Sequence, residues 1–203
     1  MRLSLSILIY FYLFFFLFYI LLIKIEYMDM ITNLIYEIGN YGPFILFFYS
    51  LFLLSKKQNL LNYYIVGIFL NTILNLILKV SFQQPRPSED PKLFNLALKK
   101  GKYLMFNNGI PFDIFGMPSG HTQSSIFSTT FVFLSTKKYN SLIVYLLLSL
   151  TTMYQRVKYN FHTVFQVFVG AWVGFLFGCL FYYLSQEKIK GLIREKNDDN
   201  FID

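Results

Sequence analysis

The chain has 203 residues, 55% of them hydrophobic and only 14% charged, a composition that excludes an ordinary soluble domain and indicates an integral membrane protein. The formal net charge of +7 does not indicate nucleic-acid binding, because the lysines and arginines lie at the ends of apolar segments and form no single basic block. The single cysteine, Cys179, excludes an intrachain disulfide framework and a cysteine zinc site.

Six apolar segments are predicted to cross the bilayer as helices, since a hydrocarbon core of ~30 Å takes about 20 helical residues. The first, Leu3 to Ile23, has no charge and no small-residue cleavage site, so we expect an uncleaved anchor helix. The second, over residues 41–54, is short and is expected to borrow residues from Ile31 onward. The others are expected over residues 60–78, 118–136, 141–153 and 161–184.

These segments predict an all-α, polytopic membrane protein with a six-transmembrane-helix bundle. No internal repeat or linker divides it, so we expect a single domain over residues 1–203, ending in a charged tail at 186–203. In the last span, Gly170, Gly174 and Gly178 recur every four residues. Such a small-residue face lets another helix approach closely.

A long polar excursion, residues 80–115, separates the third span from the fourth. Ser88-Glu89-Asp90-Pro91 is typical of a helix start, and Lys99-Lys100-Gly101 is typical of a helix stop. We therefore expect a short helix within residues 88–101. One hypothesis places it in the membrane interface, where it gates the site or recognises the lipid head group; a solvated loop helix is the alternative.

Six crossings place both termini on one side of the membrane, together with the turns at 55–59 and 136–140. These turns carry the lysine pairs 56–57 and 137–138, and cytoplasmic loops are enriched in such cations. We therefore predict that both termini face the cytoplasm, whether the protein lies in the endoplasmic reticulum or in another cellular membrane. The remaining polar breaks then face the lumenal or extracytoplasmic side.

Three of those breaks, at residues 79–87, 115–121 and 155–166, emerge on the same face of an alternating six-helix path. They contain both histidines of the chain and three cations: Lys79, Arg86, His121, Arg156 and His162. Lys79 and Arg86 are nearly two helical turns apart, so they point the same way if the third span extends that far.

This set of side chains suits transfer of a phosphoryl group. Pro118-Ser119-Gly120 before an apolar run predicts a helix start, whose unpaired N–H groups attract phosphate. Arginine binds paired phosphate oxygens, lysine adds a point charge, and both stabilise the charge of a pentacoordinate transition state. One neutral histidine can attack phosphorus while the other, protonated, donates to the departing oxygen. This chemistry calls for no metal and no other cofactor.

Lys79-x6-Arg86-Pro87, Pro118-Ser119-Gly120-His121 and Arg156-x5-His162 together resemble the three-part signature of the type 2 phosphatidic acid phosphatase superfamily, a group of integral-membrane lipid phosphatases. The resemblance covers a motif core at 79–166. It implies that His162 is the nucleophile, forming a phosphohistidine, and that His121 is the general acid. It also implies which residues bind the substrate phosphate: Lys79, Arg86, Ser119, Gly120 and Arg156.

The third motif of that family normally begins Ser-Arg and ends with an aspartate four residues after the histidine, where this chain has Gln155 and Gln166. The Gln166 carbonyl would accept the hydrogen bond of His162 and orient the ring, but without a charge. Gly116-Met117-Pro118-Ser119 and His162-Thr163-x-x-Gln166-Val167 resemble the dolichyl-diphosphatase branch. That resemblance implies a polyprenyl diphosphate substrate, hydrolysed to the monophosphate on the lumenal face.

Two alternatives stay open: a broad-specificity phosphatase of phosphatidic acid and related lipids, and a catalytically silent protein that binds lipid phosphate. Two residue-level alternatives also stay open: Ser119 and Gly120 only start a helix, and Asp113 either caps a helix or tunes the pocket. The partners expected are a lipid phosphate or diphosphate and the bilayer, with no nucleic acid and no obligate protein partner.

Overall fold

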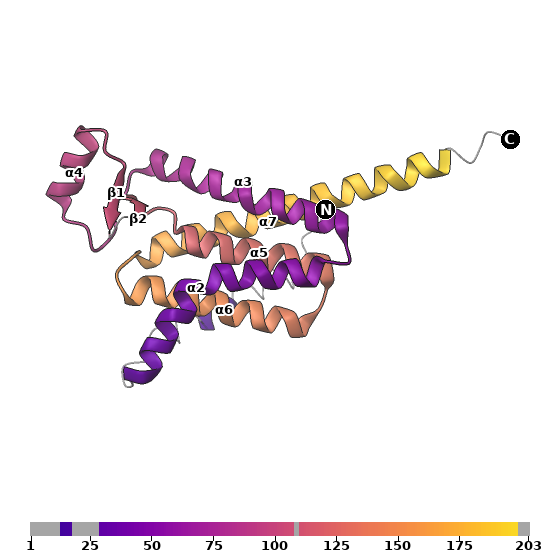
Figure 1. Ribbon diagram of the computed structural model, residues 1–203, viewed down its shortest axis with the longest axis horizontal. Helices are drawn as coiled ribbons and strands as arrows, with labels where there is room; N and C mark the ends of the chain where they lie inside the picture. The colour runs from indigo at the N-terminus through magenta and orange to yellow at the C-terminus, as the bar shows by residue number, and fades with distance from the viewer. Residues whose placement is uncertain (1–12, 18–28, 108–109, 199–203) are drawn as a thin grey trace.

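The computed structural model describes residues 13–17, 29–107 and 110–198 as a bundle of long helices with a small helix and a hairpin at one end (Figure 1). The helices are α2 (Asp29–Leu54), α3 (Gln58–Phe82), α4 (Pro91–Lys99), α5 (Gly120–Thr136), α6 (Tyr139–Lys158) and α7 (Val164–Asp198). Strands β1 (Leu104–Asn107) and β2 (Ile110–Asp113) pair antiparallel. The predicted helical architecture is confirmed, and the hairpin was not predicted.

Three of the described helices are long and apolar enough to cross a membrane, over Asn33–Leu54, Gln58–Phe82 and Val164–Glu187. They coincide with the predicted second, third and sixth spans. The helices α5 and α6 follow the predicted fourth and fifth spans but do not meet the same requirement. The predicted first span, 3–23, lies outside the described residues except for 13–17. The membrane character is therefore supported, while the count of six spans is not confirmed.

The polar composition of α5 has a structural reason. This helix lies at the centre of the bundle and contacts α2, α3, α6 and α7. Its buried hydroxyls bond to those neighbours: Ser128 pairs with Tyr64 at 2.8 Å and Thr129 with Ser149 at 2.9 Å. Because these side chains face other helices, α5 is not required to be apolar in order to lie within the bundle.

The predicted small-residue face of α7 packs against α5. A Cβ added at Gly170 would lie 2.6 Å from the carbonyl oxygen of Ser119, and one added at Gly174 would overlap the carbonyl of Gln123. The two backbones therefore touch. This contact confirms the close helix approach and holds the first turn of α5, where the site begins, against α7.

The predicted start of the short helix α4 is also confirmed. The Asp90 carboxylate accepts hydrogen bonds from the N–H groups of Lys92 and Leu93, at 2.7 and 3.1 Å, and Pro91 occupies the first helical position. Phe94 anchors α4 to the residues that follow β2. The proposed role of α4 at the lipid head group stays a prediction.

Candidate active site

The segments that carry the five titratable residues predicted for the site, namely the ends of α3 and α6, the start of α5 and the connections beside them, meet at the end of the bundle that carries α4 and the hairpin (Figure 1). Lys79 lies in the last turn of α3, His121 in the first turn of α5, Arg156 in the last turn of α6, and His162 in the connection from α6 to α7. The positive charges of Lys79, Arg86 and Arg156 act on both histidine rings. The two histidines therefore share one cationic site.

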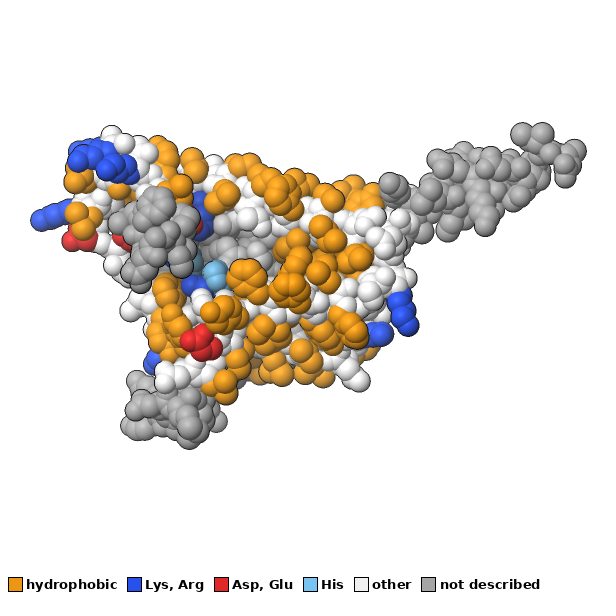
Figure 2. All heavy atoms as spheres, in the orientation of Figure 1, with side chains coloured by type: hydrophobic (Ala, Val, Ile, Leu, Met, Phe, Trp, Pro, Cys, Tyr) orange, Lys and Arg blue, Asp and Glu red, His pale blue; other side chains and the backbone are white. Residues whose placement is uncertain are grey.

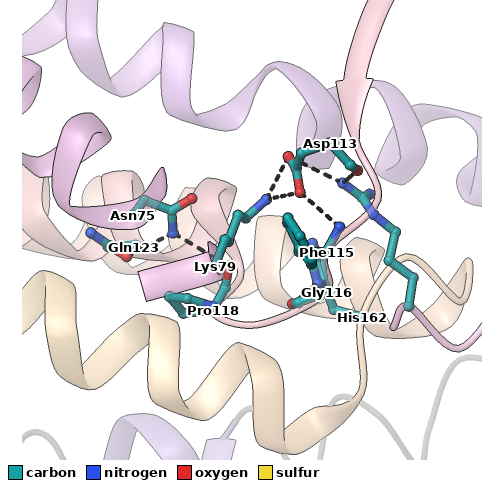
Figure 3. Close-up of polar contacts among 9 residues, drawn as sticks. Asn75, Lys79, Asp113, Phe115, Gly116, Pro118, Gln123 and His162 are labelled. Carbon is teal, nitrogen blue, oxygen red and sulfur yellow. Dashed lines mark hydrogen bonds and ion pairs between the residues drawn. The ribbon is translucent and has the colours of Figure 1, made fainter. Parts of the chain in front are cut away.

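Asp113, the last residue of β2, pairs with both cations of the first polar break (Figure 3). Lys79 Nζ lies 2.7 Å from Asp113 Oδ2 and 2.8 Å from Oδ1. Arg86 Nη2 lies 3.6 Å from Oδ2 and donates to the Asp113 main-chain carbonyl at 3.1 Å. Only 5% of Lys79 is exposed, and a buried ammonium requires such a partner. Asp113 is thus the carboxylate that fixes two of the three cations.

Arg86 reaches the site by a route different from the one expected. Gln83 adopts a left-handed conformation with φ of 47° and ends α3, so the third helix does not extend to Arg86 and the condition for both cations to share one helix face is not met. Beyond α3 the chain pairs instead with the residues after β2, through an antiparallel bridge between Pro85 and Phe115. This bridge returns Arg86 to the vicinity of Lys79.

His162 is held in a single tautomer by the backbone. The left-handed residue Asn160 (φ 55°) ends α6, and the His162 N–H donates to the Arg156 carbonyl at 3.0 Å. The ring Nδ1 lies 2.7 Å from the carbonyl oxygen of Gly116. A carbonyl only accepts, so Nδ1 carries the hydrogen and Nε2 keeps its lone pair. The buried ring therefore presents a nucleophilic nitrogen.

The expectation that Gln166 accepts the His162 hydrogen bond is wrong, because Gly116 takes that position. The Gln166 Oε1 atom accepts from the N–H of Thr163, and the Thr163 hydroxyl accepts from the N–H of Gln166, both at 3.1 Å. This reciprocal pair is a capping box at the start of α7. Gln166 Nε2 also donates to the Pro85 carbonyl at 2.9 Å. Gln166 thus links the chain beside His162 to the chain beside Arg86.

Ser119 and Gly120 differ in how they meet the site. Ser119 is fully buried; its hydroxyl pairs with Thr122 at 3.0 Å and its N–H donates to the Gln166 carbonyl at 3.1 Å. Ser119 therefore shapes the loop, and its predicted contact with a phosphate stays a prediction. Gly120 is half-buried and lies beside His121, and the N–H groups at this helix start have no acceptor within the helix.

Two buried amides that the sequence analysis missed support this loop from α3 and α5. Asn75 Nδ2 donates to Gln123 Oε1 at 2.8 Å and to the Pro118 carbonyl at 3.3 Å (Figure 3). Gln123 Nε2 in turn donates to the carbonyl and side-chain oxygens of Asn71, both at 2.9 Å. Their signal in the sequence is the four-residue spacing of Asn71, Asn75 and Lys79, which places three polar side chains on one face of a membrane helix, the face expected to lie inside the bundle.

Arg156 is 95% buried, with its guanidinium 4.7 Å from the ring centroid of Phe161 and its Nη2 donating to Asn40 Oδ1 at 3.1 Å. The Nε atoms of Arg156 and Arg86 are buried and have no hydrogen-bond partner within the described part of the chain. These N–H groups are therefore available to the oxygens of an anion. Over residues 13–17, 29–107 and 110–198, no group of three or more metal-binding side chains occurs.

An apolar groove leads from the site along the bundle. It encloses about 1260 Å³, part of it open to the surroundings, between α2, α3 and the first turn of α5. Its walls are mostly aromatic and aliphatic, and His121 lies at its polar end. The residues that line the groove are Pro43, Phe44, Phe47, Phe48, Ile65, Ile68, Phe69, Thr72, Asn75, Gly120, His121 and Ser124. Figure 2 shows hydrophobic side chains over this face and a histidine beside them.

We predict that His162 is neutral at pH 7. Burial, followed by the positive charges of Arg86 and Lys79, lowers the pKa of His162 well below its ordinary value of 6.5. The nucleophilic form therefore persists below pH 6.5. In a His121→Gln variant, His162 is the one histidine left of the two. Its labelled ring resonances should titrate below pH 6.5, and adding Arg86→Gln should move the midpoint upward; a midpoint at or above 6.5 contradicts the prediction.

Comparison with known proteins identifies relatives of this chain by sequence and by fold. A family profile described as the PAP2 superfamily matches residues 60–190. The dolichyldiphosphatase of Saccharomyces cerevisiae is 27% identical over 186 residues, which cover 81% of this chain and 70% of the yeast protein. The crystal structure of Aquifex aeolicus LpxE has a TM-score of 0.57 and 22% identity, covering 77% of this chain and 87% of LpxE, and so shares the fold.

Proposed function

This chain belongs to the PAP2 superfamily, and from that premise we propose that it hydrolyses a polyprenyl diphosphate of the dolichyl type to the monophosphate, through a phosphohistidine. One observation carries the proposal. The His162 ring binds the Gly116 carbonyl through Nδ1, which leaves the lone pair on Nε2, and the charges of three cations act on it, while His121 of the same site lines an apolar groove. A charged head group and a long apolar tail match these two parts.

In the first step, Nε2 of His162 attacks the terminal phosphorus. The bond from phosphorus to the bridging oxygen breaks, and His121 gives its proton to that oxygen as the lipid monophosphate leaves. The Gly116 carbonyl stabilises the positive charge that develops on His162, since it accepts the Nδ1 hydrogen at 2.7 Å. Arg86, Lys79 and Arg156 bind the equatorial oxygens, whose charge grows in the transition state.

In the second step, water attacks the phosphohistidine. His121, now neutral, takes a proton from the water, the bond from phosphorus to Nε2 breaks, and inorganic phosphate leaves with His162 neutral again. The three side-chain cations supply the positive charge that metal ions supply in other phosphatases. We therefore propose that the reaction is independent of metal.

The choice of a polyprenyl tail rests on two observations. The S. cerevisiae relative is named a dolichyldiphosphatase. The groove that ends at His121 is walled by Phe44, Phe48 and Phe69, each more than half exposed, and by branched aliphatic side chains. Isoprene units carry methyl branches, and such a broad apolar wall buries them without a tight fit.

We propose that the protein lies in the endoplasmic reticulum or another cellular membrane. The end of the bundle that carries the active site, the site end, would face the lumen or the extracytoplasmic space, and both termini would face the cytoplasm. The helices α3 and α6 end, and α5 and α7 begin, at the site end. The lysine-rich turns at 55–57 and 137–138 lie at the opposite end, where the positive-inside rule places the cytoplasm.

Substrate comparison with the purified full chain in detergent tests the proposed function. Phosphate release is expected to be fastest with dolichyl diphosphate, slower with undecaprenyl diphosphate, and at least about tenfold slower with phosphatidate, because only a diphosphate has a lipid monophosphate as leaving group. Release should persist in excess chelator. Equal rates on all three lipids would indicate the broad-specificity phosphatase, and strict magnesium dependence would contradict the mechanism.

A further inference from the structure

Helix α2 precedes the region matched by the family profile, yet it contributes to the site. Two glycines let it approach α6 very closely. A Cβ added at Gly39 would overlap the side chain of Gln155, and one added at Gly42 would overlap the hydroxyl of Thr152. The backbone of α2 is therefore pressed against the last turns of α6, next to Arg156.

Asn40 lies between these glycines and contacts two functional groups. Its side-chain Oδ1 accepts a hydrogen bond from Arg156 Nη2 at 3.1 Å. Its main-chain carbonyl accepts a hydrogen bond from the His121 ring. One residue of α2 thus joins the phosphate-binding arginine of α6 to the general acid of α5.

A proline explains why this part of α2 is available for such contacts. Pro43 has no N–H, so the carbonyl of residue 39 has no partner within the helix, and the ring displaces the helix there. Figure 1 shows α2 bent within its length. The segment before Pro43 can therefore lean across the site end, where Asn40 meets α6 and α5.

Because the side chain of Asn40 is a neutral amide, it binds Arg156 without reducing the positive charge of the guanidinium. Asp113 holds Lys79 by neutralising part of its charge, whereas a neutral amide oxygen orients the Arg156 guanidinium and leaves its full positive charge for a phosphate. The Arg156 Nε remains without a partner in the described residues, and the Phe161 ring covers one face of the guanidinium. Asn40 therefore fixes the direction in which the free N–H groups point.

We propose that Asn40 is a positioning residue: its amide oxygen aims Arg156 at the transferred phosphate, and its main-chain carbonyl orients the ring of His121. This inference rests on the proposed phosphatase site but not on the identity of the lipid. The main-chain contact survives any side-chain substitution, so an Asn40 variant tests the contact with Arg156 alone.

Orthovanadate, which adopts the pentacoordinate geometry of phosphoryl transfer, is the probe, and its binding to the full chain is measured by calorimetry in detergent. Asn40→Ala should weaken binding by about 10- to 100-fold, the effect of losing one hydrogen bond to a charged group. In an Arg156→Ala background, Asn40→Ala should add no more than about a twofold change. Tyr41→Ala, at the exposed neighbouring position, should leave binding unchanged.

Asn40→Asp separates positioning from a merely structural role. The carboxylate keeps the acceptor and hence the fold, so the melting temperature should stay at the wild-type value, while vanadate binding falls because the new charge neutralises Arg156. The proposed role of Asn40 would be overturned if Asn40→Ala bound vanadate with wild-type affinity. It would also be overturned if Asn40→Ala weakened binding as much in the Arg156→Ala background as in the wild type. Neither result would affect the proposed phosphatase function. Failure of the wild type to bind vanadate would overturn the phosphatase site as well.

Discussion

Replacing His162 with alanine is expected to lower phosphate release from every lipid substrate by at least about 10⁴-fold, the effect of removing a covalent nucleophile. Nε2 of His162 keeps its lone pair because Nδ1 is bound to the Gly116 carbonyl, and the charges of Arg86 and Lys79 keep the ring neutral. The three cations remain in the variant, so vanadate should still bind. Loss of turnover with retained binding separates chemistry from recognition.

Measurement of the intermediate makes this prediction sharper. Wild-type protein quenched during turnover of terminally labelled lipid diphosphate should carry label that is stable in base and labile in acid, as expected of a phosphohistidine, and His162→Ala should carry none. Lys158→Ala is the matched control, since Lys158 is an exposed cation at the end of α6, four residues before His162. Equal phosphate release by wild type and His162→Ala would favour the catalytically silent protein.

The sequence predicted the helices and the meeting of the motifs because both depend on local patterns. Apolar runs of about 20 residues predict membrane helices, and charge and proline signals placed the start of α4 at Asp90 and Pro91. Because successive membrane helices alternate in direction, polar segments that are far apart in the chain were expected at the same face of the membrane. These inferences needed no knowledge of side-chain contacts.

The route of Arg86 and the partner of His162 depend on long-range backbone pairing, which local patterns do not specify. The Asn108-Gly109 dipeptide between two apolar runs was a hairpin signal that the sequence analysis did not use. Thr163-x-x-Gln166 is likewise the pattern of a capping box and predicts the start of α7. The carbonyl of Gly116 left no signal, because every residue has one.

Replacing His121 with alanine is expected to slow the two substrate classes very differently. A lipid phosphate monoester expels an alkoxide, whose conjugate acid has a pKa far above neutral, and so requires protonation in the transition state. A lipid diphosphate expels a monophosphate with a pKa of about 6, which leaves without help. The loss in the first step should therefore be about 10³-fold with phosphatidate and about tenfold or less with the diphosphate.

This difference changes which step limits the rate. Water attack on the phosphohistidine still requires a base, so with the diphosphate the His121→Ala variant should form the intermediate quickly and hydrolyse it slowly. Rapid-quench kinetics should then show a burst of lipid monophosphate equal to the enzyme concentration, followed by slow turnover, and no burst with phosphatidate. Lys158→Ala again serves as the control. Equal losses on both substrates, without a burst, would mean that His121 orients the substrate and transfers no proton.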